Sequence, residues 1–306
     1  KATRDDEMHR TVDQWLAELT DLTDQARASQ AFQDWLDVQS RFHDYSYRNT
    51  LLIKQQCPVA TQVAGYRTWQ REFDRHVREG ESAIWIWAPI ITKRCPECHN
   101  SESYHAESDC DYDETPPVEW ERGLVGFRPA PVFDISQTEG EPLPELETAA
   151  HGAAGKLVPA LLQAADDLGI DARVLPEEEW DGGEAQGHCK PQPNVGRPLV
   201  EVKDRETEAA IAGVLIHEYA HALLHVGVGD DTERTKREVE AEAVAYVVGR
   251  HFGLDTRNSA FYLASWANED GDALEERLGR ISRTAEAVID ATEAELSDGE
   301  GTAGPD

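Results

Sequence analysis

Apolar residues recur at helical spacing in the first part of the chain. Between residues 7 and 40 they stand three or four positions apart, which predicts helix. A run of isoleucine and tryptophan at 83–89 predicts a strand, since β-branched and aromatic residues favour extended backbone. The helical stripes consist of Val12, Trp15, Leu16, Leu19 and Leu22, then Phe32, Trp35, Leu36 and Val38. We expect these side chains to face a core.

The second half of the chain alternates short extended runs with longer helical ones. Residues 170–175 and 199–202 predict strands, and 182–198, rich in Gly and Pro, predict a loop or hairpin. Helices are predicted at 157–168, 211–226, 235–252, 261–266 and 274–289. We expect the 199–202 strand to align an extended ligand by edge pairing. The pattern places the chain in the α+β class, with a mostly helical second domain.

Length and composition divide the chain into two domains. We expect the first at 1–137, a linker rich in Gly, Pro and Ala at 138–155, and the second at 156–290. Three hundred and six residues allow each domain its own core. The last stretch, 291–306, is small and acidic and is predicted to be disordered.

Acidic side chains dominate, with 60 Asp and Glu against 29 Lys and Arg and a formal charge of -31. Their spread along the chain favours a halophilic host, because surface acid keeps proteins hydrated in strong salt. A DNA-mimicking surface is the rival interpretation, and eight tryptophans argue against a disordered acidic chain. The chain begins with lysine, so we expect it to be trimmed at its start. Without a signal-peptide pattern or a long apolar run, we expect a cytoplasmic protein that does not contact membrane.

The sequence His217-Glu218-Tyr219-Ala220-His221 lies inside a predicted helix. Residues four apart stand on one helix face, so His217 and His221 can bind one Zn²⁺. Glu218 lies beside the open position of such a metal, where a general base takes a proton from water. The pattern predicts a catalytic zinc site. His225, one turn further on, is predicted to pack near the site and not to bind the metal.

A carboxylate on the next predicted helix is expected to complete the zinc site. Glu242 follows His221 by 21 positions and is flanked by apolar or small residues, where an uncompensated carboxylate is costly. We therefore predict Glu242 as third ligand. Glu238, one turn earlier on the same face, is the alternative. Glu240 points to the opposite side and is predicted to be a solvated surface charge.

Three of the five cysteines cluster between 93 and 122, which resembles an insertion. The spacing Cys-x2-Cys-x6-His-x4-Cys can close a tetrahedral structural zinc site. Its predicted ligands are Cys95, Cys98, His105 and Cys110, with His99 as the alternative fourth ligand. Elsewhere, Cys189 is predicted to be a buried thiol and His188 a surface residue.

Between 41 and 94 basic residues outnumber acidic ones, with nine Lys or Arg against five Asp or Glu in an otherwise acidic chain. Aromatic residues alternate with them, a combination that suits single-stranded nucleic acid, since arginine follows phosphates and rings stack on bases. The alternative is an ordinary domain whose aromatic residues form its core. The predicted DNA contacts are Arg48, Arg67, Trp69, Arg71, Arg75 and Arg78.

Several motifs match one known family. They are Tyr45-Ser46-x-x-Asn49, Gly65-Tyr66-Arg67-Thr68-Trp69, Val77-Arg78-x-Gly80-Glu81, Val132-Phe133-Asp134-Ile135-Ser136-Gln137-Thr138, the nine residues from His217 to His225, Glu238-x-x-x-Glu242-Ala243 and Tyr262-x-Ala264-Ser265-Trp266. Together they resemble ArdC-type antirestriction proteins. The resemblance implies an N-terminal single-stranded-DNA-binding domain and a zincin-like metallopeptidase domain of the ImmA/IrrE type. Asp74 departs from the glycine usual in that family.

These observations predict a zinc metallopeptidase that hydrolyses a protein substrate, with Glu218 as base and an N-terminal domain that binds single-stranded DNA. One zinc is expected to be catalytic and a second structural. The alternative is a non-proteolytic, DNA-binding antirestriction protein with structural zinc only. A third hypothesis lies between them, in which single-stranded DNA licenses cleavage of a repressor. Tyr262 is a candidate to polarise the scissile carbonyl, although a core tyrosine is the simpler interpretation.

Overall fold

The structure, a computed structural model, divides the chain into two compact units. Unit 1 comprises residues 1–12 and 55–141, and unit 2 comprises 13–54 and 142–306. The described residues are 3–21, 25–141, 154–192, 194–205, 207–226, 234–254 and 271–298. The predicted boundary after 137 lies close to the observed one, but residues 13–54 belong to unit 2 and not to the N-terminal domain.

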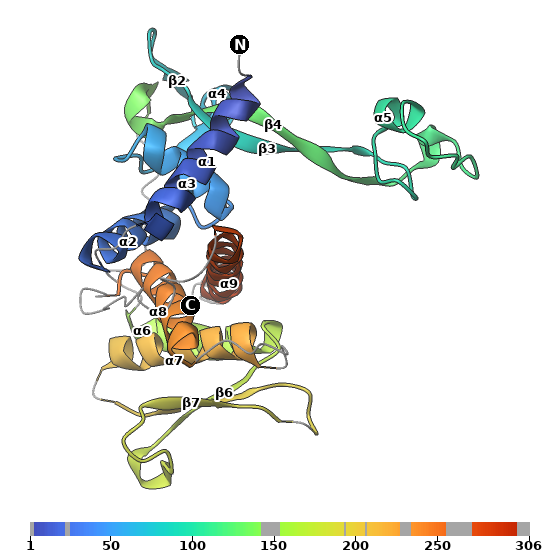
Figure 1. Cartoon of the computed structure of the whole chain (residues 1–306). Coiled ribbons are helices and arrows are strands. Elements are labelled where there is room, and N and C mark those ends of the chain that lie inside the picture. The colour runs from blue at the N-terminus through green and yellow to red at the C-terminus, as the bar shows by residue number, and fades with distance from the viewer. Residues whose placement is uncertain are drawn as a thin grey trace, which may run out of the picture. The chain divides into compact units, whose positions relative to one another are not determined.

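Unit 1 contains short helices and five strands (Figure 1). Its strands are β1 (Val63–Gly65), β2 (Arg75–Val77), β3 (Ile84–Lys93), β4 (Arg122–Asp134) and β5 (Thr138–Gly140). Its helices are α4 (Tyr66–Glu72) and α5 (Glu102–Ala106), with 3₁₀ turns at Pro117–Glu119 and Ile135–Gln137, the start of α1 (Arg4–Asp21) and the end of α3 (Tyr47–Gln56). The predicted strand at 83–89 is therefore the first part of β3.

β4 is the central strand of an antiparallel sheet with the order β1-β4-β3. The end of β4 is tied to the chain before β1 by Asp134, which is 1% exposed. Its carboxylate accepts hydrogen bonds from the backbone N–H groups of Thr61 (2.8 Å), Gln62 (3.1 Å) and Ser136 (3.0 Å). Burying a carboxylate is tolerable when backbone donors satisfy it, and Asp134 thereby fixes the join between two strands.

β2 and β5 form a second, two-stranded sheet. Because β5 is a strand, the predicted linker at 138–155 is wrong in its first three residues, and its section 142–153 lies outside the described residues. Asp74, immediately before β2, has φ +50°, in the left-handed region. Aspartate tolerates this region better than most residues other than glycine.

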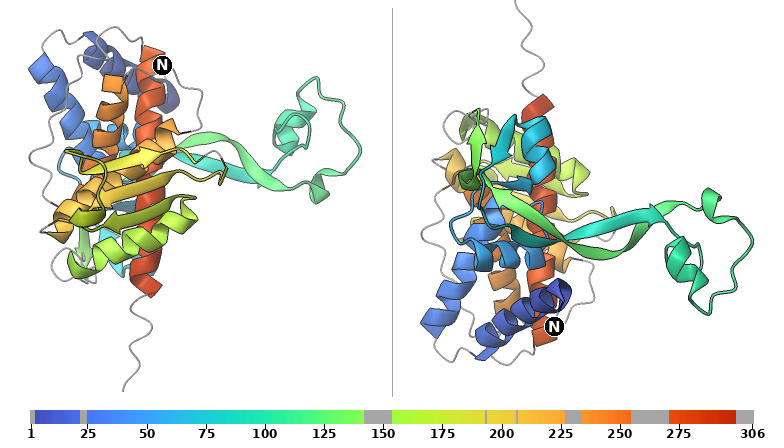
Figure 2. Two further views of the ribbon diagram at one scale, coloured as in Figure 1. Left: turned by 90° about the horizontal axis from the view of Figure 1, so that it is seen from below. Right: turned by 90° about the horizontal axis from the view of Figure 1, so that it is seen from above.

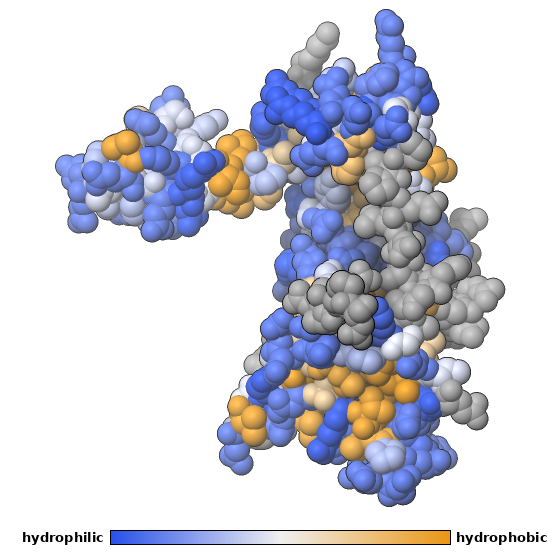
Figure 3. All heavy atoms as spheres, turned by 180° about the vertical axis from the view of Figure 1, so that it is seen from behind, coloured by the Kyte–Doolittle hydropathy of each residue, from blue (hydrophilic) through white to orange (hydrophobic). Residues whose placement is uncertain are grey.

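β3 and β4 continue beyond the small sheet as a two-stranded ribbon, and the segment between Lys93 and Arg122 forms its tip (Figure 1). The predicted insertion 93–122 coincides with this tip. Figure 3 shows apolar spheres along the ribbon. Among the residues of β3 and β4, Ile91, Leu124 and Phe127 are 50%, 43% and 56% exposed.

Unit 2 combines long helices with a three-stranded sheet (Figure 2). The helices are α2 (Gln25–Arg41), most of α3, α6 (Ala154–Asp167), α7 (Glu208–His225), α8 (Arg234–His251) and α9 (Gly271–Asp298), and the strands are β6 (Asp171–Leu175), β7 (Gly187–Lys190) and β8 (Leu199–Lys203). The strand order is β6-β8-β7, with β6 and β8 parallel. α7 packs against β7 and β8 on one side and against α6, α8 and α9 elsewhere.

The mixture of helix and sheet agrees with the predicted α+β class. The predicted disordered tail is wrong for residues 291–298, because α9 runs to Asp298 and buries Thr292. The predicted helix at 261–266 and the tail from 299 lie outside the described residues. Among the helices that are described, none is long and apolar enough to span a bilayer.

Candidate metal centre

α7 presents the His-Glu-x-x-His motif because its opposite face is anchored in the core. Thr207 caps the helix by accepting a hydrogen bond from the N–H of Ala210. Tyr219 is fully buried, and its hydroxyl donates to the carbonyl of Leu161 in α6 (2.8 Å). This contact fixes the rotation of α7, so His217 and His221 turn away from the core.

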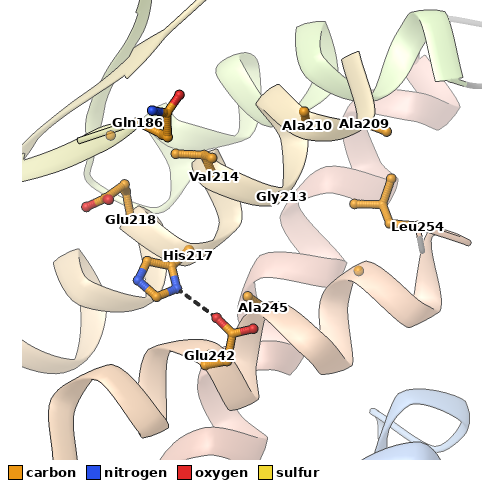
Figure 4. A pocket seen from close by; sticks show the side chains of 12 residues that line it. Gln186, Ala209, Ala210, Gly213, Val214, His217, Glu218, Glu242, Ala245 and Leu254 are labelled. Carbon is orange, nitrogen blue, oxygen red and sulfur yellow. Dashed lines mark ion pairs between the residues drawn. The ribbon is translucent and has the colours of Figure 1, made fainter. Parts of the chain in front are cut away.

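Three donor atoms converge beside α7. The Nε2 atoms of His217 and His221 lie 3.1 Å apart, and the Oε2 atom of Glu238 on α8 lies 3.6 Å from each. Glu242 instead faces the other nitrogen of His217, with Oε2 3.4 Å from Nδ1 (Figure 4). The structure therefore favours Glu238 as third ligand and not the predicted Glu242, which is placed to orient the His217 ring.

The three donors fit Zn²⁺. With bonds of about 2.0–2.2 Å, tetrahedral zinc holds its N and O ligands about 3.3 Å from one another. The observed separations of 3.1 and 3.6 Å bracket that value. Two imidazoles and one carboxylate also match the ligand set of catalytic zinc, which leaves a fourth position for water or substrate.

The charges around the motif favour a cation. Burial opposes the charged form of His217, but the carboxylates of Glu238 and Glu242 raise its pKa to about 9. His217 and His221 in turn lower the pKa of Glu238. Burial raises the pKa of Glu218, whose side chain is almost completely enclosed. Positive charge is thus stabilised where the two imidazoles and Glu238 meet.

Two cavities open on the motif, of about 520 Å³ and about 650 Å³. His217, Glu218 and Gly187 line both of them. Gly187 begins β7, and a Cβ at this position would lie 2.9 Å from Cγ of Glu218. Glycine therefore lets the backbone of β7 reach the candidate base. β7 and β6 are the edge strands of the described sheet and β8 is the central one, so the prediction that 199–202 aligns a ligand by edge pairing is wrong.

β7 also carries the His188 and Cys189 pair. His188 is not a free surface residue, since its Nε2 lies 2.7 Å from Oε2 of the buried Glu201. Cys189, predicted to be a buried thiol, is only partly buried. This burial raises the pKa of its thiol to about 12, so little of the reactive thiolate forms at neutral pH.

The prediction that Glu240 is a solvated surface charge is wrong. Its side chain is completely buried, and Oε1 lies 2.7 Å from Nη1 of Arg277 on α9. His225 is buried beside it, with Nε2 3.6 Å from Oε2 of Glu240, and Arg280 donates to the carbonyl of Leu224 at the end of α7 (2.8 Å). Together the Glu240–Arg277 ion pair, the His225–Glu240 contact and the Arg280 hydrogen bond connect the C-terminal turn of α7 with α8 and α9.

Replacing Glu240 by glutamine is expected to lower the free energy of unfolding of unit 2 by about 1.5–3 kcal/mol, since a buried charged hydrogen bond is lost. Denaturant-induced unfolding followed by circular dichroism measures the change. The matched control is Glu208→Gln, which alters an exposed glutamate on α7. Equal stability of the two variants would contradict a structural role for Glu240.

At the tip of the ribbon in unit 1, Cys95, Cys98, His105 and Cys110 bring one donor atom each within 4.8 Å of one another. Sγ of Cys95 lies 4.0 Å from Sγ of Cys110, and Sγ of Cys98 lies 3.4 Å from Nδ1 of His105. Tetrahedral zinc with bonds of about 2.3 Å to sulfur requires about 3.8 Å between sulfurs. The set therefore fits zinc, with four protein ligands.

His105, and not His99, is the histidine of this group. His99 is exposed and adopts φ +61° in the turn after Cys98. Hydrogen bonds from the Asn100 backbone and then from His105 lower the pKa of Cys98 to about 6. A thiolate is the form that binds metal.

The double substitution Cys95→Ser/Cys98→Ser is expected to remove one zinc per chain and to expose the ribbon tip to proteolysis, because the tip has little apolar core of its own. Elemental analysis and limited trypsin digestion measure the two effects. Cys57→Ser, which alters a thiol outside the group, is the control. Unchanged zinc content would contradict the structural site.

Two of the predicted DNA contacts, Trp69 and Arg48, are engaged in the packing of their own units. Trp69 is 1% exposed, and its indole donates to the carbonyl of Phe133 (2.9 Å), so it belongs to the core in this structure. Arg48 lies in unit 2, where its Nε donates to Glu275 of α9 (3.0 Å). The interpretation of Trp69 as a ring that stacks on bases is therefore corrected.

Arg75 and Arg78 form hydrogen bonds with residues 136–138 and Glu81 of unit 1. Nε of Arg75 donates to Oγ1 of Thr138 (2.8 Å), and Nη2 of Arg78 donates to Glu81 and to the carbonyl of Ser136, both at 2.6 Å. Their guanidinium groups are thus partly engaged in the fold and only partly available to phosphate.

Arg67 and Arg71 remain exposed on one face of α4, four residues apart. Tyr66 and Phe73 flank them and are 47% and 37% exposed. Tyr66 is one of the aromatic residues that alternate with basic ones in the sequence, but the sequence does not show that it is exposed. An aromatic residue that faces solvent carries the same sequence signal as one in the core. The candidate Tyr262 lies outside the described residues.

No model of a protein family matches the chain. An uncharacterized protein of Bacillus anthracis is 27% identical to it over 92% of this chain. The chain spans only 51% of that relative.

The structural neighbours are ArdC proteins. They are two crystal structures of the antirestriction ArdC protein from plasmid R388, one metal-free and one bound to Mn(II). Each has a TM-score of 0.46, with 17% and 15% identity respectively. The likeness covers 82% and 95% of this chain, and 85% and 98% of those chains. At this TM-score the likeness does not transfer an architecture or an activity, so function has to be argued from the residues.

Proposed function

We propose that unit 2 is a zinc-dependent peptidase. The proposal depends on one observation, the convergence of His217, His221 and Glu238 at 3.1–3.6 Å beside a buried glutamate and two cavities. The chemistry that zinc supplies in such a site is Lewis acidity towards a water molecule and a carbonyl oxygen. The three side chains would hold the ion.

Glu218 would act as the general base. It follows His217 on the same helix and lines both cavities, so its carboxylate can reach a water molecule placed at the fourth zinc position. Its proton would then pass to the leaving amine. Glu242 keeps the His217 ring in the orientation that directs Nε2 to the site.

An extended peptide is the substrate class that suits the cavities. β7 has a free edge next to Glu218, and an edge strand offers backbone donors and acceptors to another extended chain. Pairing with β7 would lay a peptide bond across the site. Folded proteins would then be cleaved in exposed, unstructured segments.

Cleavage of a mixture of fluorogenic peptides by the full chain tests this function, in strong salt because the chain is so acidic. We expect cleavage that stops with 1,10-phenanthroline and returns with added Zn²⁺. The His217→Ala/His221→Ala variant should be inactive at every zinc concentration. Absence of cleavage in the zinc-loaded protein, or cleavage that the chelator does not affect, would overturn the proposal.

A second candidate is a non-proteolytic antirestriction protein that binds single-stranded DNA. The two solved structures that resemble this chain are of an antirestriction protein. Within this chain the candidate is supported by α4, where Arg67 and Arg71 share an exposed face beside Tyr66 and Phe73. The family resemblance of the sequence motifs implies DNA binding too, beside a metallopeptidase domain.

Binding of a fluorescent single-stranded oligonucleotide separates the two candidates. If α4 follows phosphates, Arg67→Ala/Arg71→Ala should weaken binding and reduce the slope of log K against log salt by about 1.4, at about 0.7 per phosphate contact. Arg205→Ala, an exposed arginine of unit 2, is the control. An antirestriction effect that persists in Glu218→Gln but is lost in Arg67→Ala/Arg71→Ala would favour the second candidate.

A further inference from the structure

A separate group of potential metal ligands lies in unit 2, formed by residues remote from the His-Glu-x-x-His motif in sequence. His43 follows α2, His251 is the last residue of α8, and Glu293 lies in the last third of α9. One donor atom of each lies within 4.8 Å of the others. Three elements that are far apart in the sequence thus bring two imidazoles and a carboxylate together.

The side chains are close to a coordinating arrangement. The two imidazole rings stand 4.4 Å apart at 73°, and Nε2 of His251 lies 2.7 Å from Oε1 of Glu293. Zinc would require about 3.3 Å between such donors. On binding zinc, His251 and Glu293 would therefore move slightly apart and the other donor atoms slightly together, which rotation of the half-exposed Glu293 side chain allows in part.

His43 supplies an independent indication. It is buried, yet its Nδ1 has no hydrogen-bond partner among the described residues. Its Nε2 faces Oδ1 of Asp44 at 3.5 Å and Oδ1 of Asp290 at 4.0 Å, both longer than a good hydrogen bond. Buried imidazoles are usually hydrogen-bonded or bound to metal, so the environment of His43 is incomplete without a further partner.

The charge of the surroundings favours a divalent cation. Asp44, Asp290 and Glu293 face two histidines, and none of the three carboxylates is paired with Lys or Arg in the ion pairs of the described residues. A divalent ion would offset this negative charge, which one protonated imidazole offsets only in part. Nitrogen ligands combined with carboxylate select a transition metal rather than Ca²⁺ or Mg²⁺.

We propose that His43, His251 and Glu293 bind a Zn²⁺ ion, with Asp290 or water as fourth ligand. The ion would fasten the loop after α2 and the end of α8 to α9. Because α8 also carries Glu238 and Glu242, the ion would hold in place the helix that completes the candidate metal centre. The inference does not depend on the peptidase activity.

The zinc content of the full chain tests the site. Protein without a histidine tag is stripped with chelator, reloaded with Zn²⁺ and dialysed, and its zinc is measured by elemental analysis. We expect Glu293→Gln and His251→Gln each to contain one zinc per chain fewer than the wild type. Glu293 is half exposed, so its substitution leaves the fold intact, and circular dichroism verifies this for both variants.

His76→Gln is the matched control. His76 forms a similar pair with Glu139, at 2.9 Å, but belongs to no group of three donors among the described residues. Its substitution should leave the zinc content unchanged. Equal zinc in the wild type, Glu293→Gln and His251→Gln would overturn the proposal and identify the group as ordinary ion pairs. Zinc should also raise the melting temperature of the wild type more than that of Glu293→Gln, and an equal rise would count against the site.

Discussion

Glu218→Gln is expected to lower the turnover number for peptide cleavage by about 10²–10⁴-fold, the usual contribution of a general base. Glutamine has the same size and can fill the same space between α7 and β7, but it cannot accept a proton. The metal ligands are unchanged, so zinc content should equal that of the wild type. Steady-state kinetics together with elemental analysis measures both quantities.

The effect should appear in the turnover number more than in KM, because Glu218 acts on the proton transferred in the transition state. Glu208→Gln, which removes an exposed carboxylate from the first turn of the same helix, is the control and should retain wild-type kinetics. Wild-type turnover in Glu218→Gln would rule out this residue as the base. A parallel loss of zinc would show that the substitution disturbs the site rather than the proton transfer.

The histidine pair could be predicted because its geometry is local. Four residues make about one helical turn, so the relation of His217 to His221 depends on α7 alone. Thr207 as helix cap is predictable for the same reason. The cysteine spacing was equally informative, because all four donors lie within one short segment. Only the choice between His99 and His105 required knowledge of the backbone conformation.

Which carboxylate lies nearest both Nε2 atoms could not be predicted, because it depends on how α8 rotates against α7. Glu242 was selected for its apolar neighbours, although Glu240 is the carboxylate that is fully buried. Arg277, its partner, is 37 residues away on α9, so the compensating charge is invisible in the local sequence. Burial of a carboxylate is therefore a poor guide to metal ligation when an arginine elsewhere can neutralise it.

Long-range packing also decided the domain boundary and the DNA contacts. The apolar stripe before residue 41 predicts a buried helix face but does not indicate in which unit that face is buried. In the structure residues 13–54 belong to unit 2. Likewise Trp69 and Tyr66 stand on the same short helix, one facing the core and the other solvent. The sequence marked α4 correctly as a basic, aromatic segment without showing which rings are accessible.

Glu238→Gln and Glu242→Gln are expected to differ in zinc affinity. A carboxylate that contacts a ligand contributes about 10–100-fold to metal affinity, so Glu242→Gln should weaken binding within that range. Glu238→Gln removes a ligand and should weaken binding by more than about 100-fold. Zinc affinity is measured by competition with a chelator. The same titration of His217→Ala/His221→Ala shows the zinc bound elsewhere, and the difference gives the affinity of this centre.

The two variants separate direct ligation from a general charge effect. Both residues lie on α8, one turn apart, and both substitutions preserve size and remove one charge. A simple loss of negative charge near the site would weaken zinc equally in the two variants. Only direct ligation by Glu238, whose Oε2 is equidistant from the two Nε2 atoms, makes its loss the larger. The opposite order would show that α8 turns when zinc binds and presents Glu242 to the ion, as the sequence argument expected.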